Sequence, residues 1–146
     1  ADRFIDYKTE DYTKTVSQVD YVLDTLGSAE TEKQMSIMKK GGHLVSLRAM
    51  PNGAFAKRMN LPKWKQMILG LAGRKFDKMA VKYGVHYHFI FVESNGAQLQ
   101  EVADLFSKLE IKPSIDTVYP FEEVNSALDK VANGRSRGKT VLSFKK

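Results

Sequence analysis

The chain has 146 residues, of which 42% are hydrophobic and 27% are charged, and its formal net charge is +6. These values are ordinary for a globular domain with one core, and they exclude disordered, collagen-like and coiled-coil chains. The chain has no cysteine, which excludes disulfides and thiolate zinc sites. Because it has no membrane-spanning apolar run and no signal-peptide pattern, we expect a cytoplasmic protein.

The first part of the chain predicts strands that alternate with a helix. Arg3–Tyr7 has the pattern of a lead-in to a strand, and Val19–Leu23 that of a buried strand. Ser28 is expected to cap the next helix, and Gly41 to end it in the left-handed conformation. His43–Leu47 is then the following strand. These elements predict one βα unit and the start of the next.

A helical pattern with a basic character follows. Its apolar residues recur at helical spacing, and we expect Gly70 and Gly73 to weaken or end this helix. A second helix is predicted from Arg74 to Tyr83, ended by Gly84. The apolar face, which we expect to pack on the domain, consists of Leu61, Trp64, Met67, Ile68 and Leu71.

The positive charge is concentrated in residues 57–82. This stretch has eight basic residues and one acidic residue, whereas the rest of the chain has 15 basic and 16 acidic residues. Three interpretations remain open: a solvated helical insertion packed on the domain, a helix on an anionic membrane, and a nucleic-acid surface. We favour the first, because no nucleic-acid motif is present.

The second half continues the alternation of strands and helices. In chain order it predicts a strand at Tyr87–Val92, a helix capped by Asn95, an extended segment at Ser114–Tyr119, a helix from Pro120 to Gly134 and a strand at Thr140–Phe144. Strands that alternate with helices over short connections predict right-handed βαβ units and a parallel sheet. The predicted class is therefore α/β.

Ligands of a parallel sheet lie beyond the carboxyl ends of its strands, which directs attention to 24–27, 46–49 and 89–91. None of the ten glycines has another glycine two residues away, so the glycine fingerprint of a dinucleotide-binding turn is missing. His86 and His88 are two residues apart and therefore lie on one face of a strand, a spacing that can bind a metal. Because no cysteine or paired carboxylate accompanies them, we favour packed or hydrogen-bonded histidines over a metal site. We predict no catalytic residue.

Several segments together resemble the C-terminal half of a medium-chain dehydrogenase/reductase of the zinc-independent quinone-oxidoreductase-like branch. In that family a first strand, a glycine-rich turn, a first helix and a catalytic domain precede this region. We therefore expect residues 1–146 to be the C-terminal part of a Rossmann-like NADP-binding domain, with 112–120 and 139–146 packing toward the absent catalytic domain. The matching segments are Ala1–Lys8, Val19–Gly27, Lys39–Ser46, Lys112–Asp116, Tyr119–Val124 and Gly138–Leu142.

The resemblance also implies roles for individual positions in binding NADPH. Tyr7 matches a position that can reach the adenosine 2′-phosphate, 25–27 the turn beside the ribose and pyrophosphate, and 47–49 the loop under the nicotinamide ribose. Residues 89–91 match the strand end that meets the carboxamide, and Lys139 a basic position near the pyrophosphate. The implied cofactor site is Tyr7, Thr25, Leu26, Gly27, Leu47, Arg48, Ala49, Phe89, Ile90, Phe91 and Lys139.

The activity that the resemblance implies is hydride transfer from NADPH to a quinone or an activated alkene or carbonyl, without zinc. We expect this chain alone to be inactive, because the groups that polarise the acceptor belong to the absent half. We also expect a small-molecule substrate and a homodimer paired through the edge strand 87–92. We expect no binding to nucleic acid or to a membrane. The basic insertion at 51–84 departs from the simpler quinone reductases, and a binding module that uses residues 57–82 for nucleic acid or an anionic surface is the alternative.

Overall fold

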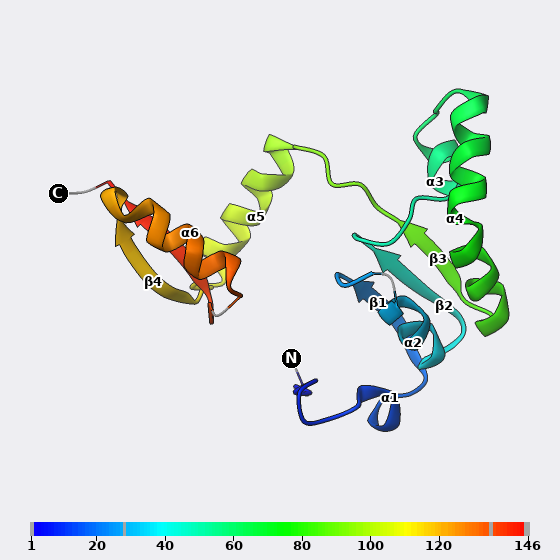
Figure 1. Ribbon diagram of the computed structural model, residues 1–146, viewed down its shortest axis with the longest axis horizontal. Coiled ribbons are helices and arrows are strands. Elements are labelled where there is room, and N and C mark those ends of the chain that lie inside the picture. Colours follow the sequence, from blue (N-terminus) through cyan, green and yellow to red (C-terminus); the bar gives the residue numbers. More distant parts are fainter. Residues whose placement is uncertain (1, 28, 135, 145–146) are drawn as a thin grey trace. The chain divides into compact units, whose positions relative to one another are not determined.

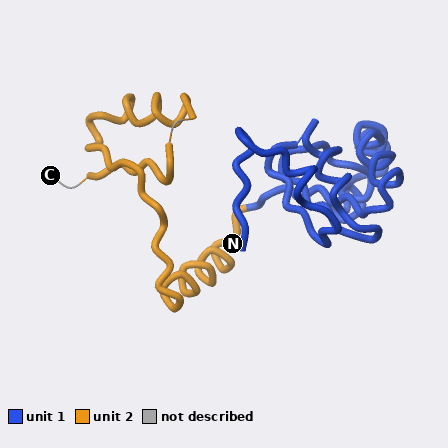
Figure 2. Tube along the Cα trace, turned by 90° about the horizontal axis from the view of Figure 1, so that it is seen from below, with its two compact units in different colours: residues 1–93 blue, residues 94–146 orange. Residues whose placement is uncertain are grey.

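The computed structural model describes residues 2–27, 29–134 and 136–144 (Figure 1). Contacts divide the chain into two compact units, Ala1–Glu93 and Ser94–Lys146 (Figure 2). The predicted cap at Ser28 lies outside the described residues. The assignment of residues 1–146 to one part of a Rossmann-like domain, with 112–120 and 139–146 packing toward a catalytic domain, stays a prediction. No helix in the described part of the chain is long and apolar enough to cross a bilayer.

The first unit is built around a three-stranded parallel sheet in the order β1-β2-β3. Its central strand pairs with both neighbours, so that Leu44 lies opposite Val22 on one side and Tyr87 on the other. The strands are β1 (Val19–Asp24), β2 (Met38–Ser46) and β3 (His86–Phe89), and the helices are α1 (Tyr12–Thr15), α2 (Ala29–Ser36), α3 (Gly53–Arg58) and α4 (Lys63–Tyr83). The predicted α/β class with parallel strands and flanking helices is confirmed.

One face of this sheet carries the core. Alternate residues of a strand point to opposite faces, and Leu44, Tyr87 and Phe89 point to the covered face. Met35 of α2 and Met79 of α4 pack into the same cluster, so both helices cover that face. The opposite face carries Tyr21, Leu23, His43, His86 and His88, all exposed or only partly buried.

Two expectations for the first part of the chain are wrong. Arg3–Tyr7 forms no strand, because no described strand offers its backbone a hydrogen-bonding partner, and Phe4 is exposed. Gly41 does not end a helix: α2 ends at Ser36, and Gly41 lies inside β2 with a φ of +80°. Positive φ suits glycine here because β2 bulges: Val19 and Tyr21 on β1 are two positions apart, whereas their partners Met38 and His43 are five positions apart.

The predicted break at Gly70 and Gly73 is also wrong, because α4 runs without interruption to Tyr83. Its packing face is a different stripe from the expected one. Leu69, Phe76 and Met79 pack on the core, whereas the expected face is exposed or only partly buried. Trp64 is 59% exposed, and Met67 and Leu71 are each 65% exposed.

The strand predicted at Tyr87–Val92 is shorter and ends at Phe89. Its neighbour β2 ends at Ser46, which is paired with Phe89, so no strand continues beside the following residues. The last backbone hydrogen bond between β2 and the chain after β3 is donated by the amide of Ile90 to the carbonyl oxygen of Ser46, at 3.0 Å. Residues 90–92 are exposed.

The second unit contains a two-stranded parallel sheet. Its elements are α5 (Gly96–Lys108), β4 (Ile115–Pro120), the 3-10 helix η1 (Phe121–Glu123), α6 (Val124–Ala132) and β5 (Lys139–Ser143). The predicted cap of α5 is confirmed, because the Asn95 side chain accepts from the amide of Gln98. Ala127 of α6 is the buried residue of its helix, and Lys130 binds Asp116 and Thr117 of β4. The apolar residues of α5 are exposed.

Candidate functional site

The carboxyl end of β1 is organised around the buried carboxylate of Asp24, which has no exposed surface. Its Oδ1 accepts from the amides of Leu26 and Gly27, at 3.0 and 2.8 Å. Its Oδ2 accepts from the hydroxyls of Thr31 on α2 and Ser46 on β2, at 3.0 and 2.9 Å. One side chain therefore fixes the turn after β1, the start of α2 and the end of β2.

Asp24 is held in its charged form by these four donors. Burial alone would raise the pKa of this carboxyl, since it penalises the charge. The hydrogen bonds from Gly27, Ser46, Thr31 and Leu26 outweigh burial and hold the pKa below its usual value. The carboxylate is therefore a structural acceptor rather than a proton donor.

The loop after β2 joins the same network through Ser46. The Ser46 hydroxyl oxygen accepts from the amides of Arg48 and Ala49, at 3.3 and 2.9 Å. Gly27, with a φ of +70°, lies against this loop, and a Cβ at its position would be 2.9 Å from the carbonyl oxygen of Arg48. The turn after β1 and the loop after β2 thus meet backbone to backbone, which only glycine permits at position 27.

The end of β3 is fixed from α3. The guanidinium of Arg58 donates to the carbonyl oxygen of Phe89 at 2.5 Å and lies 5.7 Å from the centre of the Phe55 ring. Phe55 in turn meets Phe89 edge to face, with ring centres 5.1 Å apart. The three strand ends that the sequence analysis selected therefore lie together at the carboxyl-terminal end of one sheet.

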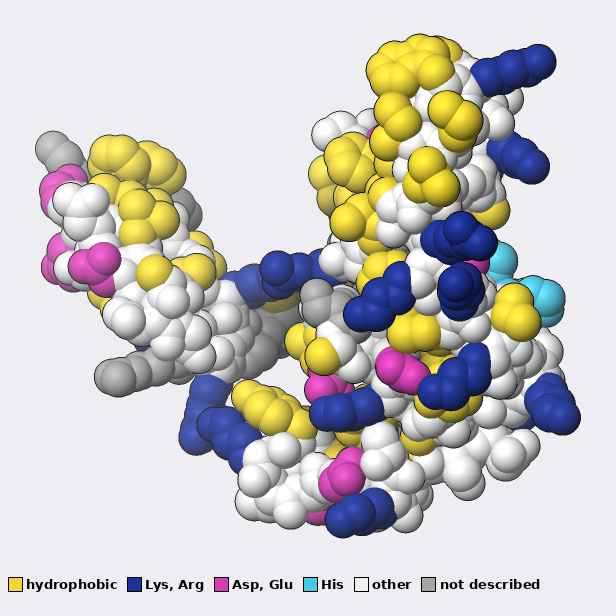
Figure 3. Space-filling view, turned by 45° about the vertical axis from the view of Figure 1, so that its right-hand side comes forward, with side chains coloured by type: hydrophobic (Ala, Val, Ile, Leu, Met, Phe, Trp, Pro, Cys, Tyr) yellow, Lys and Arg dark blue, Asp and Glu magenta, His cyan; other side chains and the backbone are white. Residues whose placement is uncertain are grey.

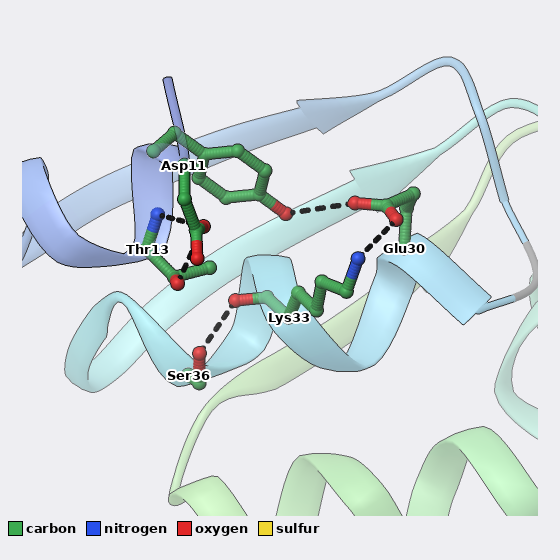
Figure 4. Close-up of polar contacts among 6 residues, drawn as sticks. Asp11, Thr13, Glu30, Lys33 and Ser36 are labelled. Carbon is green, nitrogen blue, oxygen red and sulfur yellow. Dashed lines mark hydrogen bonds and ion pairs between the residues drawn. The ribbon is translucent and has the colours of Figure 1, made fainter. Parts of the chain in front are cut away.

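A surface hollow of about 630 Å³ lies beside the carboxyl end of β1 and is lined by both Tyr7 and Leu26. Figure 4 shows the polar contacts of its wall: Glu30 accepts from the Tyr12 hydroxyl and pairs with Lys33 at 2.7 Å. Burial and the neighbouring Glu30 raise the pKa of Tyr12, so its hydroxyl stays protonated. Lys8 also lines the hollow and has no ion-pair partner among the described residues.

The structure brings most of the predicted cofactor residues to one place. Residues 25–27 lie against 47–49, residues 89–90 are bonded to the same strand end, and Tyr7 shares the hollow with Leu26. Phe91 follows Ile90, whose amide makes the last backbone hydrogen bond to β2, and its side chain is exposed. Lys139 is in the second unit, on β5.

Sequence reasoning missed the residues that hold these loops, chiefly Asp24, Thr31, Ser46 and Arg58. The available signal was an acidic residue that closes an apolar strand, with hydroxyl residues seven and 22 positions later. A carboxylate at that place has to be satisfied by nearby donors, because a buried unpaired charge is costly.

All three histidines of the chain meet on the uncovered face of the sheet, where His43 of β2 joins His86 and His88 of β3. Nδ1 of His43 lies 3.0 Å from Nε2 of His88, and the rings of His43 and His86 stack with centres 4.7 Å apart. His88 is hydrogen-bonded and His86 is stacked, which agrees with the interpretation of these two residues as packed or hydrogen-bonded histidines. Among the described residues, no group of three or more His, Cys, Asp or Glu side chains could hold a metal ion.

This cluster predicts a pH dependence of stability. Burial, and then the neighbouring His43 and His86, lower the pKa of His88 from its usual 6.5. Between the lowered pKa and 6.5 the unfolded chain binds more protons, so the free energy of unfolding should fall as the pH falls through this window. Urea titrations above and below pH 6.5 should show this slope, and His88→Gln should reduce it. An unchanged slope in His88→Gln would contradict the assignment.

Comparison with known proteins agrees with this architecture. The parallel sheet with helices packed beside it is Rossmann-like. Residues 1–142 match the model of the zinc-binding dehydrogenase family, and the chain belongs to this family. The predicted resemblance to the C-terminal half of such a dehydrogenase is thereby confirmed.

The relatives are much longer than this chain. The mitochondrial NAD(P)H oxidoreductase RTN4IP1 of Mus musculus is 32% identical over 148 residues, covering 98% of this chain and 37% of the relative. A quinone oxidoreductase from Coxiella burnetii superposes with a TM-score of 0.68 at 19% identity, over 97% of this chain and 38% of the other. An alcohol dehydrogenase superfamily protein from Novosphingobium aromaticivorans gives a TM-score of 0.64 at 22% identity, over 97% and 42%. The two structural matches show the fold, and the chain spans under half the length of these proteins.

Proposed function

We propose that this chain is the cofactor-binding part of an NADPH-dependent oxidoreductase that reduces a quinone or an activated alkene or carbonyl. The observation that carries the proposal is the meeting of the turn at 25–27 with the loop at 47–49, beside the hollow that contains Tyr7. The relative named as an NAD(P)H oxidoreductase supports the cofactor class. The relative named as a quinone oxidoreductase motivates the acceptor class, while its structural match supports the fold.

The residues present fit a dinucleotide. Gly27 carries no side chain over the turn, which lets a pyrophosphate approach the backbone. Tyr7 and Lys8 can donate to a 2′-phosphate, and Arg48 offers a further positive charge to the nucleotide. The nicotinamide, when bound, supplies a hydride, and the role of this chain is to hold and orient it. No residue here is assigned to polarising the acceptor.

The remaining expectations belong to this proposal. The position of β3 at the edge of its sheet supports a homodimer paired through residues 87–92, although the strand available for pairing is shorter than that range. Zinc independence and the contact of Lys139 with the pyrophosphate stay predictions. The cytoplasmic location does too, and the name of the RTN4IP1 relative places that protein in the mitochondrion.

The test is nucleotide affinity, measured by titration calorimetry with NADPH and NADH. We expect Arg48→Gln to weaken both nucleotides about tenfold, which corresponds to about 1.4 kcal/mol and to the loss of one charge-assisted hydrogen bond. Tyr7→Phe should weaken NADPH alone, because its hydroxyl is assigned to the 2′-phosphate. Tyr21→Phe, at an exposed tyrosine on the uncovered sheet face, is the matched control and should change neither affinity.

Two outcomes would overturn the proposal. The first is the absence of saturable binding of either nucleotide by the chain. The second is robust quinone reduction by the chain alone, since that would put the acceptor-polarising groups within these residues. An equal effect of Tyr7→Phe on both nucleotides would remove Tyr7 from the 2′-phosphate site.

A further inference from the structure

The outer side of α4 carries an apolar stripe that nothing in its unit covers. Trp64, Met67, Ile68 and Leu71 are spaced at i, i+3, i+4 and i+7, which places them on one side of the helix. All four are more than half exposed. Leu69 and Phe76 lie on the side that packs on the core, so α4 is apolar on two sides. Packing explains one side only.

Positive charge surrounds this stripe. Lys63 and Lys65 flank Trp64 in the first turn, and Arg74 and Lys75 follow Leu71 within one turn. The Lys65 ammonium lies 5.3 Å from the centre of the Trp64 ring. The chain has no acidic residue between Glu32 and Asp77. Figure 3 shows hydrophobic side chains gathered at the upper end of the α3 and α4 region, with Lys and Arg side chains beside them.

The stripe also protrudes from its unit. The first half of α4 extends past the carboxyl ends of the strands, as Figure 1 shows. Apart from Gly73, the buried residues of α4 lie near its other end, at Met79 and Ala80. A flat surface could therefore contact Trp64 and Leu71 without meeting the sheet.

We propose that the first half of α4 docks on an anionic lipid surface. An apolar stripe with tryptophan, bordered by lysine and arginine, fits the boundary between lipid headgroups and acyl chains. The charge argues against a second copy of this chain as the occupant, because a symmetric pair would bring the same cations face to face. The proposal is independent of the proposed function, because its readout is lipid binding.

Trp64 is the only tryptophan of the chain, so its fluorescence reports the contact directly. The chain is titrated with vesicles of phosphatidylcholine alone and with vesicles of equal parts phosphatidylcholine and phosphatidylserine. We expect the emission to shift to shorter wavelength only with the anionic vesicles, and the shift to weaken as salt screens the charges. Unchanged emission with anionic vesicles, or an equal shift with both kinds, would overturn the proposal.

Variants locate the surface by vesicle flotation. Trp64→Gln and Leu71→Gln should each lower binding to anionic vesicles at least about tenfold, because each removes a large apolar side chain from the contact. Leu99→Gln on α5 is the matched control, since Leu99 is also exposed. These exposed positions should leave the far-UV circular dichroism unchanged.

The charge contribution has its own matched pair. Changing both Lys63 and Lys65 to Gln should weaken vesicle binding about fivefold per lysine. This factor corresponds to the binding energy of about 1 kcal/mol that each cation contributes near an anionic membrane. The same changes at Lys108 and Lys112 should have no effect. Equal effects of the two pairs would overturn the assignment to α4, and so would retention on RNA together with absence from floated vesicles.

Discussion

Replacement of Asp24 by alanine should lower the free energy of unfolding by at least about 3 kcal/mol. Two amides and two hydroxyls donate to this carboxylate. The carboxylate is buried, and each buried donor left without an acceptor costs about 1 to 3 kcal/mol. Urea unfolding measures the loss. Asp2→Ala is the matched control, because Asp2 is exposed and the structure gives it no contact.

Asp24→Asn separates shape from charge. The amide oxygen can still accept from Leu26 and Gly27, so we expect a loss smaller than that of Asp24→Ala. The lowered pKa of Asp24 means that the unfolded chain binds more protons than the folded chain between the lowered pKa and 3.8. This contribution to stability is complete above pH 3.8 and disappears as the pH falls through the lowered pKa.

In Asp24→Asn that part of the acid dependence should vanish. A variant that unfolds in acid with the slope of the original chain would show that other carboxylates carry it. A loss of stability in Asp24→Ala no larger than in Asp2→Ala would show that the network at the strand ends does not hold the unit together.

The sequence predicted the elements that are fixed by local signals. The apolar run at Val19–Leu23, the left-handed glycine at Gly84 and the cap at Asn95 all appear where expected. Each depends on residues within one or two turns of the chain. The parallel arrangement followed too, because alternating strands and helices permit few other connections.

What the sequence did not predict depends on contacts between distant segments. Gly41 sits in a bulge that exists only because β1 and β2 pair with unequal spacing. Arg3–Tyr7 has a strand pattern but no described strand to pair with. The two sides of α4 look alike in sequence, since both are apolar, and only the position of the sheet distinguishes Leu69 from Met67.

The candidate site divides in the same way. Positions at strand ends followed from the order of elements and from the family resemblance. The side chains that hold those ends were missed, because Asp24 and Ser46 are 22 residues apart. Arg58 and Phe89 are 31 residues apart, with α4 between them. Such partners meet only after the sheet and α3 are in place.

Gly73→Ala should lower the free energy of unfolding by about 1 to 3 kcal/mol, through overpacking between α4 and the segment before α3. A Cβ at Gly73 would lie 2.5 Å from the Cβ of Asn52 and 2.8 Å from the carbonyl oxygen of Pro51. Asn52 cannot easily move, because its side chain caps α3 through the amide of Phe55 and donates to Asp77 of α4 at 2.6 Å.

Gly70→Ala is the matched control, one turn earlier on the same helix. The nearest atom to a Cβ there is the Cα of Gly53, at 3.9 Å, which is ordinary contact. This change should raise the free energy of unfolding by up to about 1 kcal/mol, because alanine favours the helix over glycine. Both variants gain the same helix propensity, so the difference between their urea midpoints isolates the contact at Gly73. Equal midpoints would contradict that contact. Because α3 carries Arg58 to the Phe89 carbonyl, this contact also fixes the end of β3 in the candidate site.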